Sequence, residues 1–552
     1  MRKASLAAIG TMIFAFAFAS FVSASPDYQQ WLDEAYPADG PGAAVIVVRD
    51  NEVLFRSAAG MADMELGVPL TPANVFRIGS ITKQFTAAGI LLLEEQGKLS
   101  VSDNINKYLP DYPTQGHTIK IENLLSHTSG IFNYTDIPGY FDGAAIRKDV
   151  TTEELIAVFA NLPMNFAPGE AYSYSNSGYV LLGAIIEKVS GQTYAEFMQT
   201  AIFDKLGLKH SYHGGPQIIL NRAHGYQGEA GDYSNAAYLS MTQPHGAGAL
   251  LSTVDDLAQW SNALFGGELL SKESLKKMTT DFELNNGEHA GYGFGLGVRE
   301  RFGEREIAHN GGIHGFSTSG IWLPKQKIYA AVLSNHADSG SPDFLAARMA
   351  FDAAGADYPK LVAIEIDADK LPQYLGVYRI NENETRNVML EDGRLYTQRT
   401  GGGRLEIVAH AEDAFFYPGG FTHLVFRRDR SGNVTAMDMY QGGADKAERA
   451  ERVSDLPQGK WDAVDVSAEV YDLWAGNYAM ASGATLAVRR DGSQLFVQLT
   501  GQPPFEVFPL SVTRYFLKDV DAELEFTAGD DGRGKTVVIY QNGTEEVANR
   551  VD

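Results

Sequence analysis

The sequence predicts an α+β domain, an antiparallel sheet flanked by helices, followed by two small antiparallel β-barrels. Three observations predict this fold class. Strand-like segments lie near both ends of the region from about 30 to 360, and helix-like segments lie between them. After about residue 365, short alternating runs with glycine turns replace the helical periodicity. These runs also repeat with an offset of 100 residues.

Length and composition agree with this division and exclude several classes of function. The chain has 552 residues, enough for two or three domains, and 44% of them are hydrophobic. It has 45 Lys and Arg against 69 Asp and Glu, a formal charge of −24, which argues against a protein that binds the backbone of nucleic acids. Because the chain has no cysteine, disulfides, thiolate metal sites and a cysteine nucleophile are excluded.

The first 24 residues have the pattern of a secretory signal peptide. Arg2 and Lys3 give a positive start, residues 6–21 are nearly all apolar, and residues 22–24 (Val-Ser-Ala) form a small-x-small cleavage site. We therefore expect cleavage before Ser25 and a periplasmic or secreted protein. The alternative is an uncleaved membrane anchor, although no second apolar stretch of spanning length follows in the sequence.

Residues 25–365 form the first predicted domain. Its elements follow from hydrophobic periodicity, and glycines mark where its helices end. Because strands come first and last, we expect the N-terminal and C-terminal strands to share one sheet. The predicted elements are paired strands at 43–48 and 53–57, helices at 80–96 and 178–189, and paired strands at 315–323 and 328–335.

The last part of the chain is an internal repeat. Tyr374-Leu375-Gly376-Val377-Tyr378 matches Trp474-Ala475-Gly476-Asn477-Tyr478, and four further matches keep the same offset. We predict two β-barrel domains, at 366–460 and 461–552, because closing a small sheet removes its exposed edges. The charged stretch 445–465 is the predicted linker between them.

Ser80 and Lys83 are the first candidates for chemistry. A serine followed three residues later by a lysine, at the start of a helix, places both side chains on one face about a turn apart. The lysine can accept the proton of the serine when burial lowers its pKa, and this activates the serine as a nucleophile. The pattern alone is weak, because Ser274-Leu275-Lys276-Lys277 contains it too and because a helix cap beside a surface lysine has the same spacing.

Tyr174 and Asn176 are the second pair of candidates. A tyrosine phenol acts as a general acid or base when nearby cations lower its pKa. An asparagine two residues later can hydrogen-bond both the lysine and a substrate amide. Tyr172 is a rival phenol only two residues away, and Tyr233-Ser234-Asn235 has the same spacing in a less favourable place.

The third candidate segment is His309-Asn310-Gly311-Gly312, just before the second strand pair. Glycines at a strand edge allow the backbone of a substrate to approach closely. The backbone N–H groups of Gly312 and Ser80 are therefore candidates for an oxyanion hole that stabilises a tetrahedral intermediate.

His309 itself has several interpretations. It can tune Lys83 or Tyr174, or it can contact the substrate. With Lys83 it implies a locally basic pocket. A metal site formed by His309 and His314 would lack a third ligand at helical spacing, so we expect no metal and no cofactor.

The order Ser-x-x-Lys, Tyr-x-Asn, His-x-Gly resembles the penicillin-recognising serine hydrolases, which include class C β-lactamases, D,D-peptidases, D-aminopeptidases and related esterases. Four further segments, 124–130, 166–170, 248–253 and 292–297, also resemble this family. The resemblance covers about residues 26–352 and implies a β-lactamase-like fold for the first domain.

The same resemblance implies roles for the candidate residues. Ser80 would be the acylated nucleophile, Lys83 and Tyr174 the proton-transfer pair, and Asn176 a substrate-binding residue. Ser126-His127, which has the look of a catalytic pair, is then structural.

The third motif departs from the β-lactamase pattern. Where those enzymes carry Lys-Thr-Gly, this chain has His309-Asn310-Gly311. The lysine of the family supplies a fixed positive charge for the carboxylate of a β-lactam or peptide, so its loss argues against efficient β-lactam hydrolysis. D-Aminopeptidases of the family carry His-x-Gly and two C-terminal barrels. In such a relative a loop of the last barrel reaches the active site. The resemblance therefore implies that residues 500–505 or a neighbouring turn reach the active site in this chain.

These observations predict an exported serine hydrolase that cleaves amide bonds of short peptides, including those with D-residues, as an aminopeptidase does. A carboxylesterase, or a weak β-lactamase or D,D-carboxypeptidase, is the alternative, because each needs the same acylated serine. A non-catalytic penicillin-binding or cell-wall-binding module is a third interpretation. The expected partner is a small peptide, amide or ester, with no nucleic acid and no membrane contact apart from an uncleaved signal; a homodimer stays open.

Overall fold

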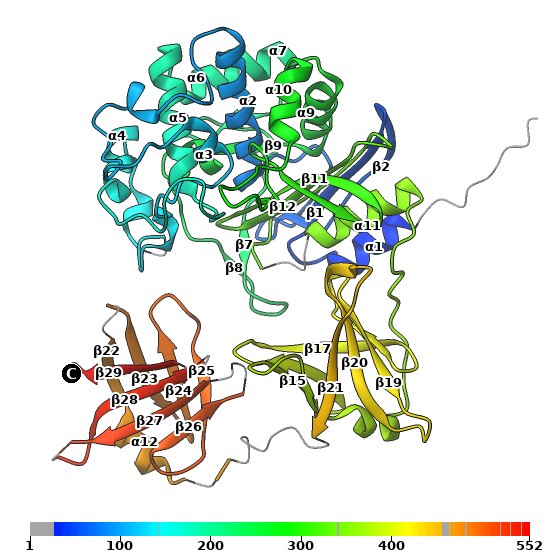
Figure 1. Cartoon of the computed structure of the whole chain (residues 1–552), viewed down its shortest axis with the longest axis vertical. Coiled ribbons are helices and arrows are strands. Elements are labelled where there is room, and N and C mark those ends of the chain that lie inside the picture. The colour runs from blue at the N-terminus through cyan, green and yellow to red at the C-terminus, as the bar shows by residue number, and fades with distance from the viewer. Residues whose placement is uncertain are drawn as a thin grey trace, which may run out of the picture.

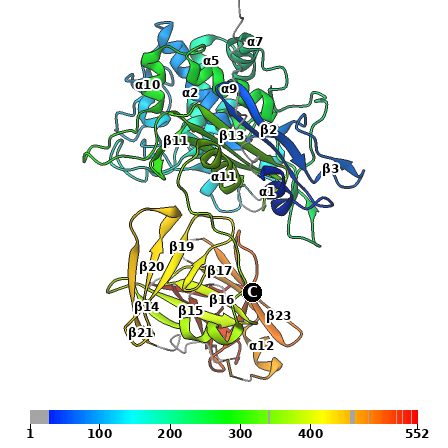
Figure 2. The same ribbon diagram turned by 90° about the vertical axis from the view of Figure 1, so that its right-hand side faces the viewer.

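The described chain forms one large N-terminal α+β domain and two closed barrels, which lie on the same side of that domain (Figure 1, Figure 2). This confirms the predicted fold class. The predicted signal peptide, residues 1–24, lies outside the described residues. Within the described ranges, no helix combines the length and the apolar character needed to cross a membrane. The computed structural model describes residues 27–141, 143–338, 342–454, 463–464, 466–480, 483–518, 520, 522–529, 531–541 and 544–552.

A six-stranded antiparallel sheet with the order β10-β11-β12-β13-β1-β2 is the centre of the N-terminal domain. Strand β1 pairs with β13, with Ala43 opposite Ser334, so the two ends of the domain share one sheet as predicted. Strand β1 is buried on both faces, which its unbroken run of Ala, Val and Ile favours. The strands are β1 (Ala43–Arg49), β2 (Glu52–Ala59), β10 (Gly297–Arg301), β11 (Glu304–Ile313), β12 (Phe316–Leu323) and β13 (Ile328–Ser334).

Helices cover both faces of this sheet (Figure 1). On one face, α1 (Tyr28–Ala35) and α11 (Pro342–Ala354) pack in one hydrophobic cluster with side chains of β1 and β13. On the other face, a larger cluster contains α2 (Thr82–Glu95), α5 (Asn176–Ser190) and α9 (Val254–Gly266). The remaining helices are short: α3 (Ile121–Leu125), α4 (Thr152–Phe159), α6 (Tyr194–Met198), α7 (Asp204–Leu206), α8 (His245–Gly248) and α10 (Lys272–Thr279).

Three small sheets and several single helical turns complete this domain. The sheet β5-β9-β6 bears most directly on the candidate serine, because β5 leads into the turn that carries it. The strands are β3 (Met61–Asp63), β4 (Val68–Pro69), β5 (Phe76–Arg77), β6 (Tyr212–His213), β7 (Tyr226–Gln227), β8 (Ser234–Asn235) and β9 (Leu250–Ser252). The turns are 3₁₀-helices η1 (Gly79–Ile81), η2 (Ile105–Lys107), η3 (Tyr134–Asp136) and η4 (Ala145–Arg147), and the π-helix η5 (Gln199–Phe203).

Each C-terminal barrel is a closed antiparallel sheet of eight strands that follows a short helix, η6 (Ala368–Tyr374) or α12 (Ala468–Trp474). The first barrel contains β14 (Gly376–Arg379), β15 (Thr385–Glu391), β16 (Arg394–Arg399), β17 (Arg404–Ala411), β18 (Ala414–Phe416), β19 (His423–Arg428), β20 (Val434–Tyr440) and β21 (Glu448–Ser454), with η7 (Gln441–Gly443) before β21. The second contains β22 (Gly476–Met480), β23 (Thr485–Asp491), β24 (Gln494–Leu499), β25 (Phe505–Pro509), β26 (Arg514–Leu517), β27 (Ala522–Ala528), β28 (Gly534–Gln541) and β29 (Thr544–Arg550).

The predicted linker at 445–465 is wrong in its first half. Residues 448–454 form β21, which closes the first barrel by pairing with both β14 and β20. Only one side chain of this strand, Ala450, is buried, and its neighbours are charged. A strand with a single buried side chain has no hydrophobic alternation, so its sequence is indistinguishable from a charged linker.

The first barrel is docked on the N-terminal domain through Phe421. This ring belongs to the same hydrophobic cluster as α1 and α11, and its centroid lies 4.8 Å from that of Phe344 and 5.0 Å from that of Phe302. Phe302 lies in the turn between β10 and β11. The docking contact is therefore at the first end of β11, and the segment 309–312 is at its other end.

Candidate active site

Ser80 lies in the 3₁₀ turn η1, directly before α2. Gly79 has φ of 50°, a left-handed conformation that favours glycine, and this turns the chain sharply from β5 into the helix. A Cβ on Gly79 would lie 3.0 Å from the carbonyl oxygen and 3.1 Å from the nitrogen of Gly312. The serine turn is therefore packed against the edge of β11.

Lys83 lies one turn into the helix and is fully buried. Its Nζ lies 3.0 Å from Ser80 Oγ, 2.7 Å from Asn176 Oδ1 and 2.9 Å from the carbonyl oxygen of Ala247. Burial lowers the pKa of Lys83 well below its usual value. The amine therefore favours its neutral form.

The start of α5 brings Tyr174 to Ser80 and Asn176 to Lys83. Ser175 caps this helix by accepting a hydrogen bond from the N–H of Gly178, which leaves Tyr174 just before the helix and Asn176 in its first turn. Lys83 Nζ lies 4.6 Å from the centre of the Tyr174 ring. Burial raises the pKa of Tyr174, and the nearby Ser80 hydroxyl opposes that rise only in part. The phenol therefore carries its proton.

Tyr172 is placed differently from Tyr174. Its side chain is 39% exposed at the rim, and burial raises its pKa to about 12. Ser80 influences the ionisation of Tyr174 and not that of Tyr172. This favours Tyr174 as the phenol that acts on the serine.

The segment 309–312 forms the other wall of the site. Strand β10 pairs with β11 only as far as Ala308, and no described strand pairs with the same edge of β11 beyond that residue. A Cβ on Gly311 would lie 2.1 Å from the carbonyl oxygen of Ile78, so only glycine allows this approach. A Cβ on Gly312 would meet no atom within 4 Å, so this residue borders open space beside Ser80.

His309 is buried and neutral. Burial and the neighbouring Lys83 lower its pKa to about 3. Its Nδ1 lies 2.6 Å from the carbonyl oxygen of Asn310, which only accepts, so Nδ1 carries the proton and Nε2 accepts from the Tyr292 hydroxyl at 2.8 Å. Burial lowers the pKa of both Lys83 and His309, which works against the positively charged pocket expected from the sequence. Asn310, next to it, is exposed.

Three residues of the site have no catalytic role predicted from the sequence, although His127 was expected to be structural. His127 packs its ring 4.2 Å from the ring of Tyr174 and accepts a hydrogen bond from the Ser175 N–H. Tyr292 binds His309, and Ala247 supplies a carbonyl to Lys83 from 164 residues away. His127 and Tyr292 lie in segments whose only sequence signal is their resemblance to the family, and a backbone carbonyl has no side-chain signature at all.

A second turn of the chain lies against Asn176 and carries a carboxylate. Asn176 Nδ2 donates to Thr135 Oγ1 at 3.2 Å, and the Asn176 N–H donates to Asn133 Oδ1 at 2.9 Å. Asn133 Nδ2 in turn donates to Asp136 Oδ1 at 2.8 Å. Asp136 is exposed, so an acidic group stands one hydrogen-bonded residue from Asn176.

Metal binding does not fit the serine site. Both ring nitrogens of His309 are already engaged, and the ring of His314 packs against Phe141 with centroids 5.2 Å apart. Elsewhere among the described residues, Asp63, Glu65 and His224 bring ligand atoms within 4.8 Å of one another on the surface. Exposed groups of this kind are common without a metal, and Glu65 already accepts hydrogen bonds from two other side chains.

Comparison with protein families gives one match to each part of the fold. The β-lactamase family matches residues 32–355. A domain of unknown function, DUF3471, matches residues 361–455 and again residues 462–549, once for each barrel.

Comparison with curated proteins gives relatives of two kinds. Penicillin-binding protein 4* of Bacillus subtilis is 28% identical over 524 residues, which are 92% of this chain and 94% of that protein. The D-aminopeptidase of Gluconobacter oxydans is 29% identical over 327 residues, which are 56% of this chain and 59% of that protein.

Solved structures give the same picture. The octameric penicillin-binding protein homologue of Pyrococcus abyssi aligns with a TM-score of 0.57 and 26% identity, over 77% of this chain and 99% of that one. The D-stereospecific amidohydrolase of Streptomyces aligns with a TM-score of 0.52 and 27% identity, over 60% of this chain and 99% of that one.

Proposed function

Because the chain belongs to the β-lactamase family of serine hydrolases, we propose that it hydrolyses amide bonds of short peptides, including those with D-residues, through an acyl-enzyme on Ser80. The observation that carries this proposal is the contact at 3.0 Å between Ser80 Oγ and the Nζ of Lys83, a fully buried side chain. A base held against a hydroxyl in this way activates it for attack on a carbonyl carbon.

Lys83 is the base. Asn176 Oδ1 and the carbonyl oxygen of Ala247 can only accept, so they take the two N–H groups of the neutral amine. The lone pair of the nitrogen then faces Ser80 Oγ and accepts its proton. The Oγ attacks the substrate carbonyl, and the N–H groups of Ser80 and Gly312 bind the oxyanion that forms.

Tyr174 is the proton donor to the leaving group. Its phenol is protonated because burial raises its pKa, and it lies between the serine and the ring of His127. After Lys83 has taken the serine proton, Tyr174 gives a proton to the departing amine and regains one from Lys83. Water then hydrolyses the acyl-enzyme by the reverse path.

The third motif favours a substrate without a carboxylate near the scissile bond. His309 is neutral because its pKa is lowered to about 3, so the segment 309–311 offers no fixed positive charge. An exposed acidic group, Asp136, is joined to Asn176 through the side chain of Asn133. We assign Asp136 to the free amino group of the substrate, which is the recognition an aminopeptidase needs.

The relatives support the amide and D-residue parts of this proposal. One curated relative is named a D-aminopeptidase, and two of the aligned structures are a D-stereospecific amidohydrolase and a D-amino acid amidase. The D-amino acid amidase of Ochrobactrum anthropi aligns with a TM-score of 0.50.

The experiment compares four substrates with the mature chain: D-alanine p-nitroanilide, L-alanine p-nitroanilide, N-acetyl-D-alanine p-nitroanilide and p-nitrophenyl acetate. We expect turnover of the free-amine D-anilide and loss of turnover when its amine is acetylated. Turnover of the ester alone would show that the chain is an esterase and would refute the proposed amide hydrolysis.

Two variants test the roles of the residues. Ser80→Ala should lower kcat by on the order of 10⁵-fold or more and abolish labelling by a fluorophosphonate. Asp136→Asn should raise KM for the free-amine anilide and leave the ester unchanged, whereas Asp111→Asn, an exposed acid elsewhere, should change neither. Labelling of Ser80→Ala equal to the parent would refute the covalent mechanism.

We also propose that the protein is exported after cleavage of residues 1–24. Arg2 and Lys3, the apolar run and the cleavage pattern support this. N-terminal sequencing of the protein from an expressing bacterium should begin at Ser25 in the periplasmic or extracellular fraction. A cytoplasmic protein that retains residue 1 would refute it.

A further inference from the structure

A second cleft lies over the small sheet β5-β9-β6, away from the serine. Its volume is about 510 Å³, within the range of small-molecule sites. Arg77 of β5, Leu251 of β9 and His213 of β6 line it. Gln199 and Tyr238 line it as well. None of the residues that contact Ser80 lines it, so it is separate from the candidate active site.

Arg77 is the buried charge of this cleft. Its side chain is only 7% exposed, and its Nε is buried without a hydrogen-bond partner. Its guanidinium carbon lies 5.9 Å from the centre of the Phe316 ring, which is a weak substitute for a counter-ion. Burial lowers the pKa of Arg77 to about 10, with Arg222 adding to this effect, so the group is still a cation at neutral pH.

A second arginine converges on the same cleft. The N–H of Val75 donates to the carbonyl of Asn221, and the N–H of Ala223 donates to the carbonyl of Val75, so residues 221–223 run alongside β5. This brings Arg222 into the lining with Arg77. Arg222 is exposed, and it makes no ion pair with any described carboxylate.

The absence of a counter-ion among the described residues is informative in this chain. Acidic residues outnumber Lys and Arg by 69 to 45, so carboxylates are not scarce. The acid that lines the cleft, Asp149, accepts a hydrogen bond from Ser240 Oγ and is not among the groups that influence the pKa of Arg77. A buried cation without a partner costs free energy, and an anion from solution removes that cost.

We propose that this cleft binds a small dianion of carboxylate or phosphate chemistry between Arg77 and Arg222. A guanidinium binds either group through two parallel N–H donors, and two guanidinium groups match a ligand with two negative charges. Tyr238 adds a neutral donor, and Gln199 and Gln217 each have a second amide N–H besides the one given to Asp204 or His213. Cationic ligands are excluded by the same two charges.

The test is calorimetric titration of the full mature chain carrying Ser80→Ala, with inorganic phosphate and, separately, with succinate, at low salt. Using Ser80→Ala keeps the result independent of the proposed hydrolase activity. We expect one site for at least one of the two anions, with affinity that falls as salt rises. Phosphate binding alone or succinate binding alone identifies which chemistry the site takes.

Arg222→Met is the decisive variant, because Arg222 is exposed and its loss leaves the core intact. It should weaken binding by about tenfold or more, the effect of losing a bidentate charged contact. Arg430→Met, an exposed arginine in the turn after β19, is the matched control and should bind as the parent does. No binding of either anion at millimolar concentration, or equal binding by both arginine variants, would overturn the proposal.

Arg77→Met gives a second, independent readout. The substitution removes a buried, unpaired charge, so the variant should melt no lower than the parent when no anion is present. Phosphate or succinate, whichever binds the parent, should then no longer raise its melting temperature. A lower melting temperature with the anion response intact would also overturn the site.

Discussion

The two C-terminal barrels have the same fold and share their core contacts, but the polar residues of the first barrel are replaced by other residues at the matching positions of the second. In both, a tyrosine on the first strand donates to the carbonyl of the residue four positions earlier: Tyr378 to Tyr374 and Tyr478 to Trp474, each at 2.8 Å. The core phenylalanines Phe426 and Phe526 also match. The repeat therefore preserves the contact between the first strand and the short helix before it, and the aromatic core.

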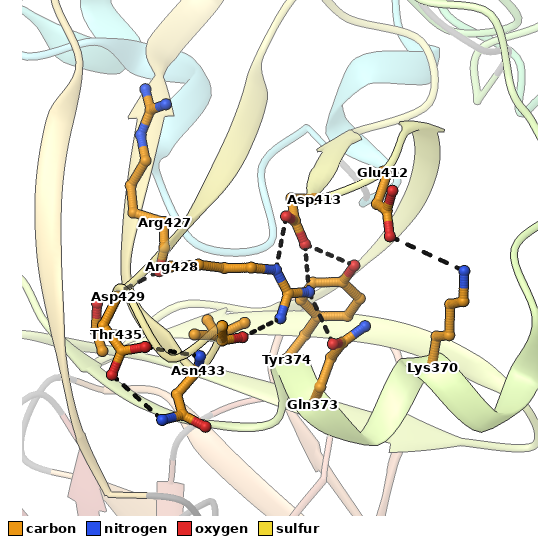
Figure 3. Close-up of polar contacts among 12 residues, drawn as sticks. Lys370, Gln373, Tyr374, Glu412, Asp413, Arg427, Arg428, Asp429, Asn433 and Thr435 are labelled. Carbon is orange, nitrogen blue, oxygen red and sulfur yellow. Dashed lines mark hydrogen bonds and ion pairs between the residues drawn. The ribbon is translucent and has the colours of Figure 1, made fainter.

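The polar groups around that core are not preserved. In the first barrel, Arg428 donates to both oxygens of Asp413 and to Gln373, and Asp413 also accepts from Tyr374 (Figure 3). In the second barrel the positions 100 residues later are apolar or uncharged: Ala528, Thr513, Leu473 and Trp474. Trp474 stacks on Phe526 and donates to the carbonyl of Val512 instead.

Their attachment to the rest of the chain differs as well. The first barrel inserts Phe421 into a cluster of the N-terminal domain. Among the described residues, the second barrel has its own cluster and meets the first barrel through a bridge between Gly403 and Val520. The comparison indicates that the first barrel is packed against the N-terminal domain as one structural unit, and that the second barrel is an appended copy.

The largest expected effect comes from breaking the docking of the first barrel. Phe421 is 3% exposed, and its ring lies between Phe302 and Phe344, with the Arg301 guanidinium carbon 5.3 Å from its centre. Truncating such a ring costs about 3–5 kcal/mol. Phe421→Ala should therefore expose the connecting segment near Lys360 to trypsin, measured as the rate at which the barrels are released.

The matched control for this substitution is Leu405→Ala, in the same barrel. Leu405 is 56% exposed, so its loss should change stability by no more than about 0.5 kcal/mol and leave the cleavage rate as it is. If both variants are cleaved equally slowly, Phe421 is not what docks the barrel.

A smaller effect should come from the polar network of the first barrel. Asp413→Asn removes the charge from a carboxylate that accepts two hydrogen bonds from Arg428. Both side chains are about a quarter exposed to solvent. With solvent screening, the expected loss is about 1–2 kcal/mol, measured by urea unfolding. Thr513→Ala at the equivalent position of the second barrel should cost less, because no charge pair is lost there.

The same network should respond to acid. Hydrogen bonds from Arg428 are the main cause that lowers the pKa of Asp413. A carboxyl group whose pKa is lower in the folded than in the unfolded chain stabilises the fold when it is ionised. This contribution is complete at pH values above the unfolded pKa, about 3.9, and is lost as the pH falls through the folded pKa. The parent should therefore lose stability below about pH 4 more steeply than Asp413→Asn. Equal acid profiles for the two proteins would contradict this role of the pair.

The parts of the fold with a strong local pattern were predictable from sequence. The paired strands β1 and β13, from the two ends of the domain, are long apolar runs, and the helix of residues 176–190 ends at Gly191, which adopts φ of 74°. The barrel repeat appeared because closure needs the same core side chains at the same spacing. Strand β21 was missed because Ala450 alone of its side chains is buried.

The candidate site was predictable in part for the same reason. Two short motifs contain the main candidates, and each spans the start of one helix. The start of α2 fixes the spacing of Ser80 and Lys83, and the start of α5 fixes that of Tyr174 and Asn176. The carbonyl of Ala247 and the ring of His127 join them only through tertiary packing. The carbonyl has no local signal, and the local pattern of Ser126-His127 does not show which side chain His127 packs against. Arg77 lies three residues before the first motif, yet only the structure reveals that it is buried without a counter-ion.

The smallest expected effect comes from removing the second barrel. A chain that ends at residue 454 keeps β21 and the docked Phe421, and among the described contacts it loses the bridge to Val520. Thr500 and Gln502 hydrogen-bond to Thr485 and Leu499 of their own barrel, so no described bond connects that turn to the serine. We therefore expect kcat/KM to change by no more than about twofold, which is about 0.4 kcal/mol against about 1.4 kcal/mol for a tenfold change. A large loss confined to free-amine substrates would instead assign the turn at 500–505 to the active site, and the second barrel would then be a specificity domain and not an appended copy.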